Sequence, residues 1–234
     1  MRLLLLTVLA LSPIISHAIE PGRFEPLPFF TWGARIGFNA TGTYIDKAVF
    51  DGKRLADYEQ DTQVGSFIAL QFRFNSSRLF FQSGIGISSN KSSVEIDRNS
   101  WDKNNQTHDY IAVSYNTKSF MVPIQAGYHI VNQSPYCMSV FTGPRLRYSP
   151  DDFSTTSFSN QSPFVLAEEQ KRFSVGWTIG LSVQIQRTFL DFEYEAGITN
   201  TSKRLYDTGG TTPDPEFEIG HRISVLSFSY GIMF

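Results

Sequence analysis

The chain has 234 residues, of which 15% are aromatic and only 18% are charged. Its formal net charge of −2 excludes a strongly basic nucleic-acid-binding surface, and no apolar run reaches the roughly 20 residues of a membrane-spanning helix. A single cysteine, Cys137, excludes an intramolecular disulfide framework. This composition is typical of a protein built from β-strands.

The first 18 residues have the pattern of a secretory signal peptide. Arg2 precedes an apolar run over residues 3–10, and Ser16-His17-Ala18 is a small-x-small cleavage site. The apolar run is too short to cross a bilayer as a helix. We therefore expect residues 1–18 to be a signal peptide and residues 19–234 to form one exported domain.

Along the rest of the chain, large apolar residues alternate with small or polar ones. The longest run without a break is FSVGWTIGLSVQIQ, residues 173–186, with glycine, serine, threonine and glutamine on its polar face. It is longer than the usual soluble strand of about 5–6 residues and meets the roughly 9–11 residues that a bilayer-crossing strand needs. The alternation predicts strands at residues 29–41, 64–75, 78–89, 118–131, 136–148, 172–186, 188–199 and 222–234.

The connections between these segments are alternately short and long. Short ones lie at residues 75–77, 132–135 and 186–187, and long polar ones at 42–63, 90–117, 149–171 and 200–221. This arrangement is typical of bacterial outer-membrane barrels. The sequence therefore predicts an all-β fold: an eight-stranded antiparallel up-and-down transmembrane β-barrel with four long extracellular loops.

Alternation also predicts which charged residues face the lumen. An eight-stranded barrel is only wide enough for its own side chains, so the inward charges should pair as a structural network. Inward carboxylates two residues apart could also form an acid–base pair, but the lumen offers no evident space for a substrate. The expected lumen charge network consists of Arg35, Arg73, Arg145, Arg147, Asp191, Glu193 and Glu195.

Candidate catalytic and metal-binding residues are sparse. The exported domain has three histidines, His108, His129 and His221, and no spaced motif joins them to a nucleophile or to other metal ligands. His221 lies near the expected barrel mouth, with Glu218 and Ser224 close in sequence. We expect no catalytic residues, no cofactor, no metal and no enzymatic activity.

Aromatic residues gather near the expected strand ends, as in the girdles of membrane barrels. These are Trp32, Tyr128, Tyr136, Tyr148 and Tyr194, whereas Trp177 suits either a girdle or the lipid-facing wall. A second group lies in the long connections, where binding a partner and packing within the loops are equally consistent with the sequence. It comprises Phe50, Tyr58, Trp101, Phe164 and Tyr206.

Several segments together resemble a known family. They are SFMVPIQAGYHI, FTGPRLRY, FSVGWTIGLSVQI, LDFEYEAGITN and LSFSYGIMF. In this order and spacing they are similar to the small outer-membrane β-barrel domain of Bacteroidetes "porin family" proteins, which are related in architecture to the OmpA and OmpX barrels. The resemblance implies an outer-membrane location and no shared catalytic residues, and eight strands are too few for an open pore. Pro144 departs from the pattern and suggests a local bulge.

The last strand resembles the signal that the outer-membrane insertion machinery reads. Its alternate residues Phe228, Tyr230, Ile232 and Phe234 are large and apolar up to the end of the given sequence. We expect this strand to pair with the first one, near residues 32–38, and so to close the barrel. We also expect replacement of Phe234 by a charged residue to impair assembly.

These observations favour a structural or surface-interaction role in the bacterial outer membrane. The expected partners are outer-membrane lipids, the barrel-insertion machinery and an extracellular ligand held by the loops, without nucleic acid and with the protein as a monomer. Two alternatives remain open: a narrow small-solute channel or binder, and a lipid-modifying enzyme that would use the rim near His221.

Overall fold

Period-two alternation produces long strands throughout the molecule. The computed structural model describes residues 27–50, 53–54, 58–97, 110–133, 135–150, 154–159, 166–200, 202–207 and 217–234. Side chains are described for residues 27–42, 62–91, 116–133, 135–150, 171–200 and 222–234. The expected signal peptide, residues 1–18, lies outside these ranges. Within them, no helix is long and apolar enough to span a membrane.

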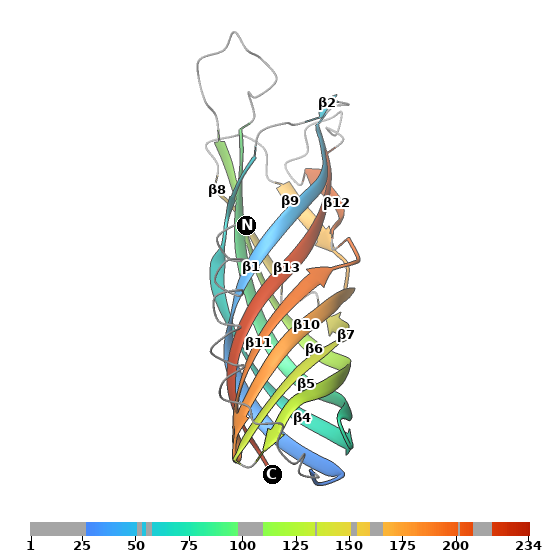
Figure 1. Ribbon diagram of the computed structural model, residues 1–234. Coiled ribbons are helices and arrows are strands. Elements are labelled where there is room, and N and C mark those ends of the chain that lie inside the picture. Colours follow the sequence, from blue (N-terminus) through green and yellow to red (C-terminus); the bar gives the residue numbers. More distant parts are fainter. Residues whose placement is uncertain are drawn as a thin grey trace, which may run out of the picture.

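Eight long strands form the wall of a closed antiparallel barrel (Figure 1). Their spatial order follows the chain, and pairing of the last strand with the first closes the cylinder. The eight wall strands are β1 (Phe30–Phe50), β4 (Gln63–Ser76), β5 (Leu79–Asp97), β6 (Tyr110–Gln133), β7 (Tyr136–Tyr148), β10 (Phe173–Ile185), β11 (Thr188–Gly197) and β13 (Phe217–Met233). The predicted fold is confirmed.

Five further strands extend the sheet beyond the wall. They are β2 (Lys53–Arg54), β3 (Tyr58–Asp61), β8 (Ser154–Ser159), β9 (Leu166–Gln170) and β12 (Ser202–Asp207). All of them fall in the connections that the sequence predicted to be long loops, so those loops are partly strand. Four wall strands, β1, β5, β6 and β13, are clearly longer than predicted, because backbone pairing continues where the apolar alternation stops. For example, β1 and β13 stay paired as far as Phe50 opposite Phe217.

Tight turns join the wall strands at one end, which we call the short-turn end; the opposite end is the long-connection end. Ser77-Arg78 and Gln186-Arg187 are two-residue hairpin turns, and Ser77 and Gln186 adopt φ values of 56° and 55°. Such positive φ values are those of the turns whose twist matches that of paired strands. The C-terminus lies at this end (Figure 1).

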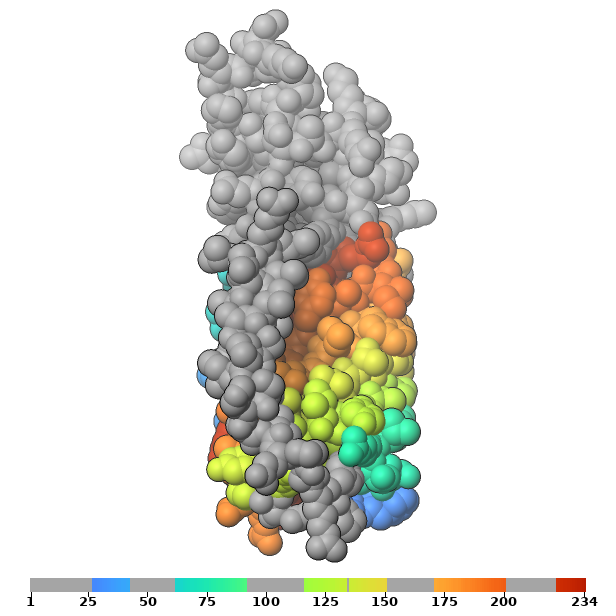
Figure 2. Space-filling view, in the orientation of Figure 1, coloured from blue at the N-terminus to red at the C-terminus, as the bar shows by residue number. Residues whose placement is uncertain are grey.

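The two faces of the wall are inverted relative to a soluble barrel. In β4 buried and exposed positions alternate along nearly the whole strand. The outward residues are apolar, such as Phe38 and Ile36, which are 65% and 60% exposed. Figure 2 shows the described part of this outer wall as oblique bands that follow one another in chain order.

The bulge expected at Pro144 is absent. Pro144 pairs with Trp177 of β10, and the register of β7 against β10 runs without a shift along the whole strand. The preceding residue, Gly143, has a φ of 154°, a conformation that residues with a β-carbon rarely adopt. On the other side of β7, the ladder with β6 lacks pairs at Gly143 and Pro144 but keeps its register across the gap, and its register shift lies between His129 and Val131 of β6.

Candidate functional site

A chain of buried ion pairs crosses the lumen. Arg35 donates to Asp191 Oδ2 at 3.1 Å and also pairs with Glu193. Glu193 in turn pairs with Arg145, whose Nη1 lies 3.0 Å from Glu195 Oε2. Arg147 then binds both oxygens of Glu195, at 2.9 and 2.6 Å. We call this set the ion-pair chain; its members are Arg35, Arg145, Arg147, Asp191, Glu193 and Glu195.

Small residues on the intervening strands give the long side chains room to meet. The three carboxylates stand on β11, while the arginines stand on β1 and β7, each separated from β11 by one strand. On β10, which lies between β7 and β11, Gly176 is one such position. A β-carbon there would lie only 2.7 Å from Cγ of Glu195. The contact between Glu195 and the arginines of β7 therefore depends on glycine at position 176, because a larger residue there would displace the carboxylate.

The ion-pair chain is charge-balanced and shielded from water. It contains three guanidinium groups and three carboxylates, and Arg147, with 8% exposure, is its most exposed member. Arg147 also donates to Ser88 Oγ at 2.9 Å, which links β7 to β5 across the lumen. A buried charge without a partner is strongly unfavourable, so mutual pairing is the arrangement that makes this interior tolerable.

Arg73 differs from the expectation that all four inward arginines share one network. Its Nε and Nη2 donate to Gln82 Oε1 at 3.2 and 3.0 Å, and its guanidinium lies 4.5 Å from the ring centroid of Phe80. Gln82 also accepts from Gln71 and donates to Gln125. Within the described residues, the hydrogen-bond partner of the Arg73 side chain is therefore a neutral amide.

Next to Arg73, toward the short-turn end, lies His129, a buried histidine to which the sequence analysis gave no role in the lumen. His129 Nδ1 lies 2.8 Å from Ser139 Oγ, and its Nε2 lies 3.2 Å from Asn75 Oδ1. The ring stacks on Phe80 at a centroid distance of 4.6 Å. The inward parity of its strand was the signal that could have revealed it. We call this region the glutamine–histidine layer: Gln71, Arg73, Asn75, Phe80, Gln82, Gln125, His129, Cys137 and Ser139.

The histidine cluster has the residue types of a catalytic triad but not the access. Cys137 Sγ lies 3.4 Å from His129 Nδ1, so a nucleophile, a base and an orienting amide are close together. His129, however, is 0% exposed, and Phe80 covers one face of its ring. A substrate cannot reach the cluster in this state, and the hydrogen bonds serve to satisfy buried polar groups.

Four inward phenylalanines fill space in the lumen beside these polar groups. Each one is paired directly across the sheet with a glycine and lies over it; a β-carbon at Gly37, for example, would be 2.6 Å from Cε1 of Phe67. Together the pairs use each of the eight wall strands once. They are Phe67–Gly37, Phe80–Gly127, Phe141–Gly180 and Phe189–Gly231.

A small cavity of about 20 Å³ lies at the long-connection end, where Arg147 and Glu195 meet Ser174 and Thr199. This volume is that of one or two water molecules, so the cavity is too small for an organic solute.

In the described part of the chain, no group of three or more His, Cys, Asp or Glu residues is placed to hold a metal ion.

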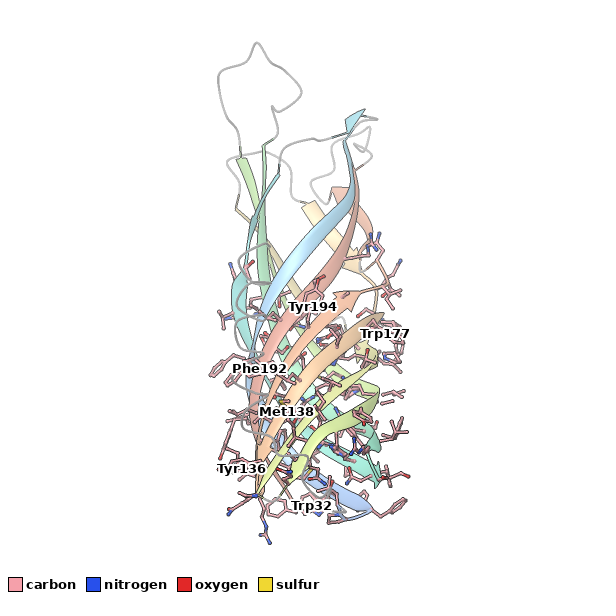
Figure 3. All side chains as sticks on the ribbon, viewed as in Figure 1. Trp32, Tyr136, Met138, Trp177, Phe192 and Tyr194 are labelled. Carbon is pink, nitrogen blue, oxygen red and sulfur yellow. The ribbon has the colours of Figure 1, made fainter. Side chains whose placement is uncertain are left out.

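On the outer wall, aromatic residues occupy two levels with an apolar zone between them. Figure 3 shows Trp32 and Tyr136 near the short-turn end, Trp177 and Tyr194 closer to the long connections, and Phe192 between the two levels. The expected girdle residues Tyr128 and Tyr148 are exposed as well: Tyr128, Tyr136, Tyr148 and Tyr194 are between 36% and 59% exposed.

The residues of the expected assembly signal line the outer face of β13. Phe228, Tyr230, Ile232 and Phe234 are each at least 40% exposed. The barrel closes where expected: Phe234 exchanges backbone hydrogen bonds with Trp32 at 2.6 and 3.0 Å, and their rings stack at 5.0 Å. Whether the insertion machinery reads these residues stays a prediction.

Some sequence-based candidates lie outside the described residues. These are His108, the side chain of His221 and the side chains of the loop aromatics Phe50, Tyr58, Trp101, Phe164 and Tyr206. The lipid-modifying alternative centred on His221 therefore stays a prediction.

The chain is similar to solved structures of other proteins. OprG from Pseudomonas aeruginosa has a TM-score of 0.61 at 10% identity, with 91% of this chain and 99% of that chain covered. Neisserial surface protein A has a TM-score of 0.41 at 12% identity, with 90% and 100% covered. No curated protein matches the sequence. At these identities the likeness to OprG shows the fold alone. A sequence model matches over residues 25–203, and the chain therefore belongs to the outer membrane protein beta-barrel domain family.

Proposed function

We propose that this protein is a monomeric outer-membrane barrel with a filled lumen, which acts as a structural or surface-interaction component of the cell envelope. Family membership places it in the bacterial outer membrane. By the architecture of such barrels, the short-turn end faces the periplasm and the long connections face outward. Interaction with a ligand or a neighbouring cell would then use these connections.

The filling of the lumen by side chains is the observation that supports the absence of an open pore. The ion-pair chain runs from Arg35 on β1 to Arg147 on β7, and Arg147 continues to Ser88 on β5. Two of the Phe–Gly pairs, Phe141–Gly180 and Phe189–Gly231, fill space in the same part of the lumen. An eight-stranded barrel filled in this way leaves no continuous aqueous path.

Planar-bilayer recording tests this proposal. The protein, refolded and inserted into a lipid bilayer, should give no stable unitary current where a trimeric porin inserted in parallel does. A variant combining Arg145→Ala and Glu193→Ala removes the central pair without changing the net charge, and it is the variant in which a current should first appear. Stable current steps from the unmodified protein would instead favour the narrow-channel alternative.

We also propose that the C-terminal strand acts as an assembly signal. Phe234 ends an exposed apolar row and is tied to Trp32 by two backbone hydrogen bonds. Phe234→Lys should therefore lower the fraction of folded, heat-modifiable protein in outer-membrane preparations. Phe29→Lys is the matched control, because Phe29 is 71% exposed at the same end but belongs to no such row. Equal assembly of the two variants would contradict the role.

A further inference from the structure

Where side chains are described, the exposed charged residues of the outer wall are all basic. Among the residues whose side chains the structure describes, all carboxylates, Asp191, Glu193 and Glu195, are buried in the lumen. The exposed charged side chains of the same ranges are all basic. They are Arg78, Lys91, Lys118, Lys171, Arg172, Arg187 and Arg222.

Three of these cations gather on one part of the wall, near the long-connection end. Lys91 is on β5, Lys118 is on β6, and Lys171 lies two residues before β10. On β5, Ser89 lies opposite Lys118, so Lys91 is two residues farther along the same strand. The amide of Ser149, just after β7, donates to the carbonyl of Arg172 at 2.7 Å, so the segment before β10 lies beside the end of β7. The strands β5, β6, β7 and β10 are consecutive in the wall (Figure 1). With neighbouring strands about 4.8 Å apart, the three cations Lys91, Lys118 and Lys171 span roughly 15 Å. We call them the basic rim patch.

An aromatic row adjoins the patch on its membrane side. Phe120 on β6 is opposite Tyr148 on β7, which is opposite Phe173 on β10. The rings of Tyr148 and Phe173 are 4.8 Å apart, and Phe173 is 70% exposed. Lys118 precedes Phe120 by two residues, and Lys171 precedes Phe173 by two, so each cation lies on the same face as its aromatic neighbour. Aromatic rings of this kind occupy the interface between lipid tails and headgroups, so the cations stand at headgroup level.

We propose that the basic rim patch binds the phosphate groups of an anionic lipid headgroup in the outer leaflet. This inference rests on the proposed orientation of the barrel, with the long connections outside. Ammonium groups attract phosphate, and three of them close together favour a headgroup that carries more than one phosphate. The aromatic row below contacts the acyl region of the same lipid. Charge complementarity is therefore combined with an apolar contact, which a free phosphate ion cannot use.

Lipid binding to the detergent-solubilised, folded protein tests the proposal. The probe is bisphosphorylated lipid A, compared with the same lipid after enzymatic removal of its phosphates, and binding is measured by native mass spectrometry. The triple variant Lys91→Gln/Lys118→Gln/Lys171→Gln should bind the phosphorylated lipid at least tenfold more weakly. The control Arg78→Gln/Arg187→Gln removes cations from the short-turn end and should stay within twofold of the unmodified protein.

Each other outcome has a defined meaning. Equal binding by the triple variant, or equal binding of the dephosphorylated lipid, would overturn the proposal. Displacement of the lipid by millimolar inorganic phosphate would overturn it too, since it would indicate a simple anion site. If the triple variant does not fold, Lys118→Gln alone should weaken binding about threefold, and unchanged binding would count against the patch. A conducting lumen would contradict the proposed function but leave this result unaffected.

Discussion

The lumen has two regions that bury polar groups in different ways. The ion-pair chain buries three positive and three negative groups that satisfy each other, whereas the glutamine–histidine layer buries one guanidinium, Arg73, among amides, hydroxyls and rings. In the first region each charge depends on its partners. In the second, hydrogen bonds between neutral groups carry the structure. A filled barrel therefore does not need ionic pairing throughout its lumen. We expect substitutions in the two regions to change the stability of the protein by different amounts.

The largest effect is expected in the ion-pair chain for Arg145→Ala. Glu193 and Glu195 would each lose a partner, and breaking a buried pair in this way costs about 3–5 kcal/mol. The free energy of unfolding, measured by urea titration in lipid vesicles with tryptophan fluorescence, should fall by that amount. Arg78→Ala, at an exposed turn, is the control. Equal unfolding midpoints for the two variants would contradict a stabilising role for the ion-pair chain.

A smaller effect is expected for Glu193→Gln, and it should exceed that of Asp191→Asn. Glu193 is shared by Arg35 and Arg145, whereas Asp191 binds only Arg35, and within the described residues its Oδ1 has no hydrogen-bond partner. Hydrogen bonds to charged groups contribute about 1.5–3 kcal/mol each. The same urea titration gives the ranking, and a reversed order would show that Glu193 is not the central link.

In the glutamine–histidine layer, Ser139→Ala should have a modest effect. It removes the hydrogen bond to His129 Nδ1, whose net contribution is about 0.5–1.5 kcal/mol for a neutral pair. Cys137 Sγ, 3.4 Å from the same nitrogen, remains as a weak partner. Thermal unfolding in detergent, read from the gel mobility of unheated samples, measures the change. A loss as large as that of Arg145→Ala would remove the distinction between the two regions.

The smallest effect is expected for Arg73→Met. Methionine can replace much of the volume of the guanidinium side chain, Gln82 Oε1 keeps its bond from Gln71, and a buried charge without a carboxylate partner disappears. We expect a change of no more than about 1 kcal/mol, because replacing buried ionic groups by apolar ones is often neutral. Arg145→Met provides the comparison. Strong destabilisation by Arg73→Met would show that Arg73 has an essential electrostatic role.

Much of this fold follows from the alternation of residues along the chain. The run 173–186 assigned both faces of β10, and the inward parity of Asp191, Glu193 and Glu195 in β11 is found in the structure. Strand ends were harder to predict. Residues 42–50 and 217–221 lack a regular apolar alternation, yet they take part in the β1–β13 pairing, because a backbone ladder needs no apolar face.

The pairing within the lumen could not be read from the sequence in the same way. Parity places Arg35, Arg73 and Arg145 inside, but it does not say how far each side chain reaches or which carboxylate it meets. That depends on the stagger of eight strands and on small residues such as Gly176 on the strands between them. The hydrogen bonds of His129 to Ser139 and Asn75 depend on the same stagger.

Alternation with period two predicted the membrane-barrel class, the eight wall strands and the inward or outward face of their residues, because it is a local property of an extended backbone. The tertiary structure was needed to see that Arg73 joins a neutral layer while Arg35, Arg145 and Arg147 form one ion-pair chain. It was also needed to see that Lys91, Lys118 and Lys171 come together on the rim. These groupings arise from closure and stagger, which join residues that are distant in the chain.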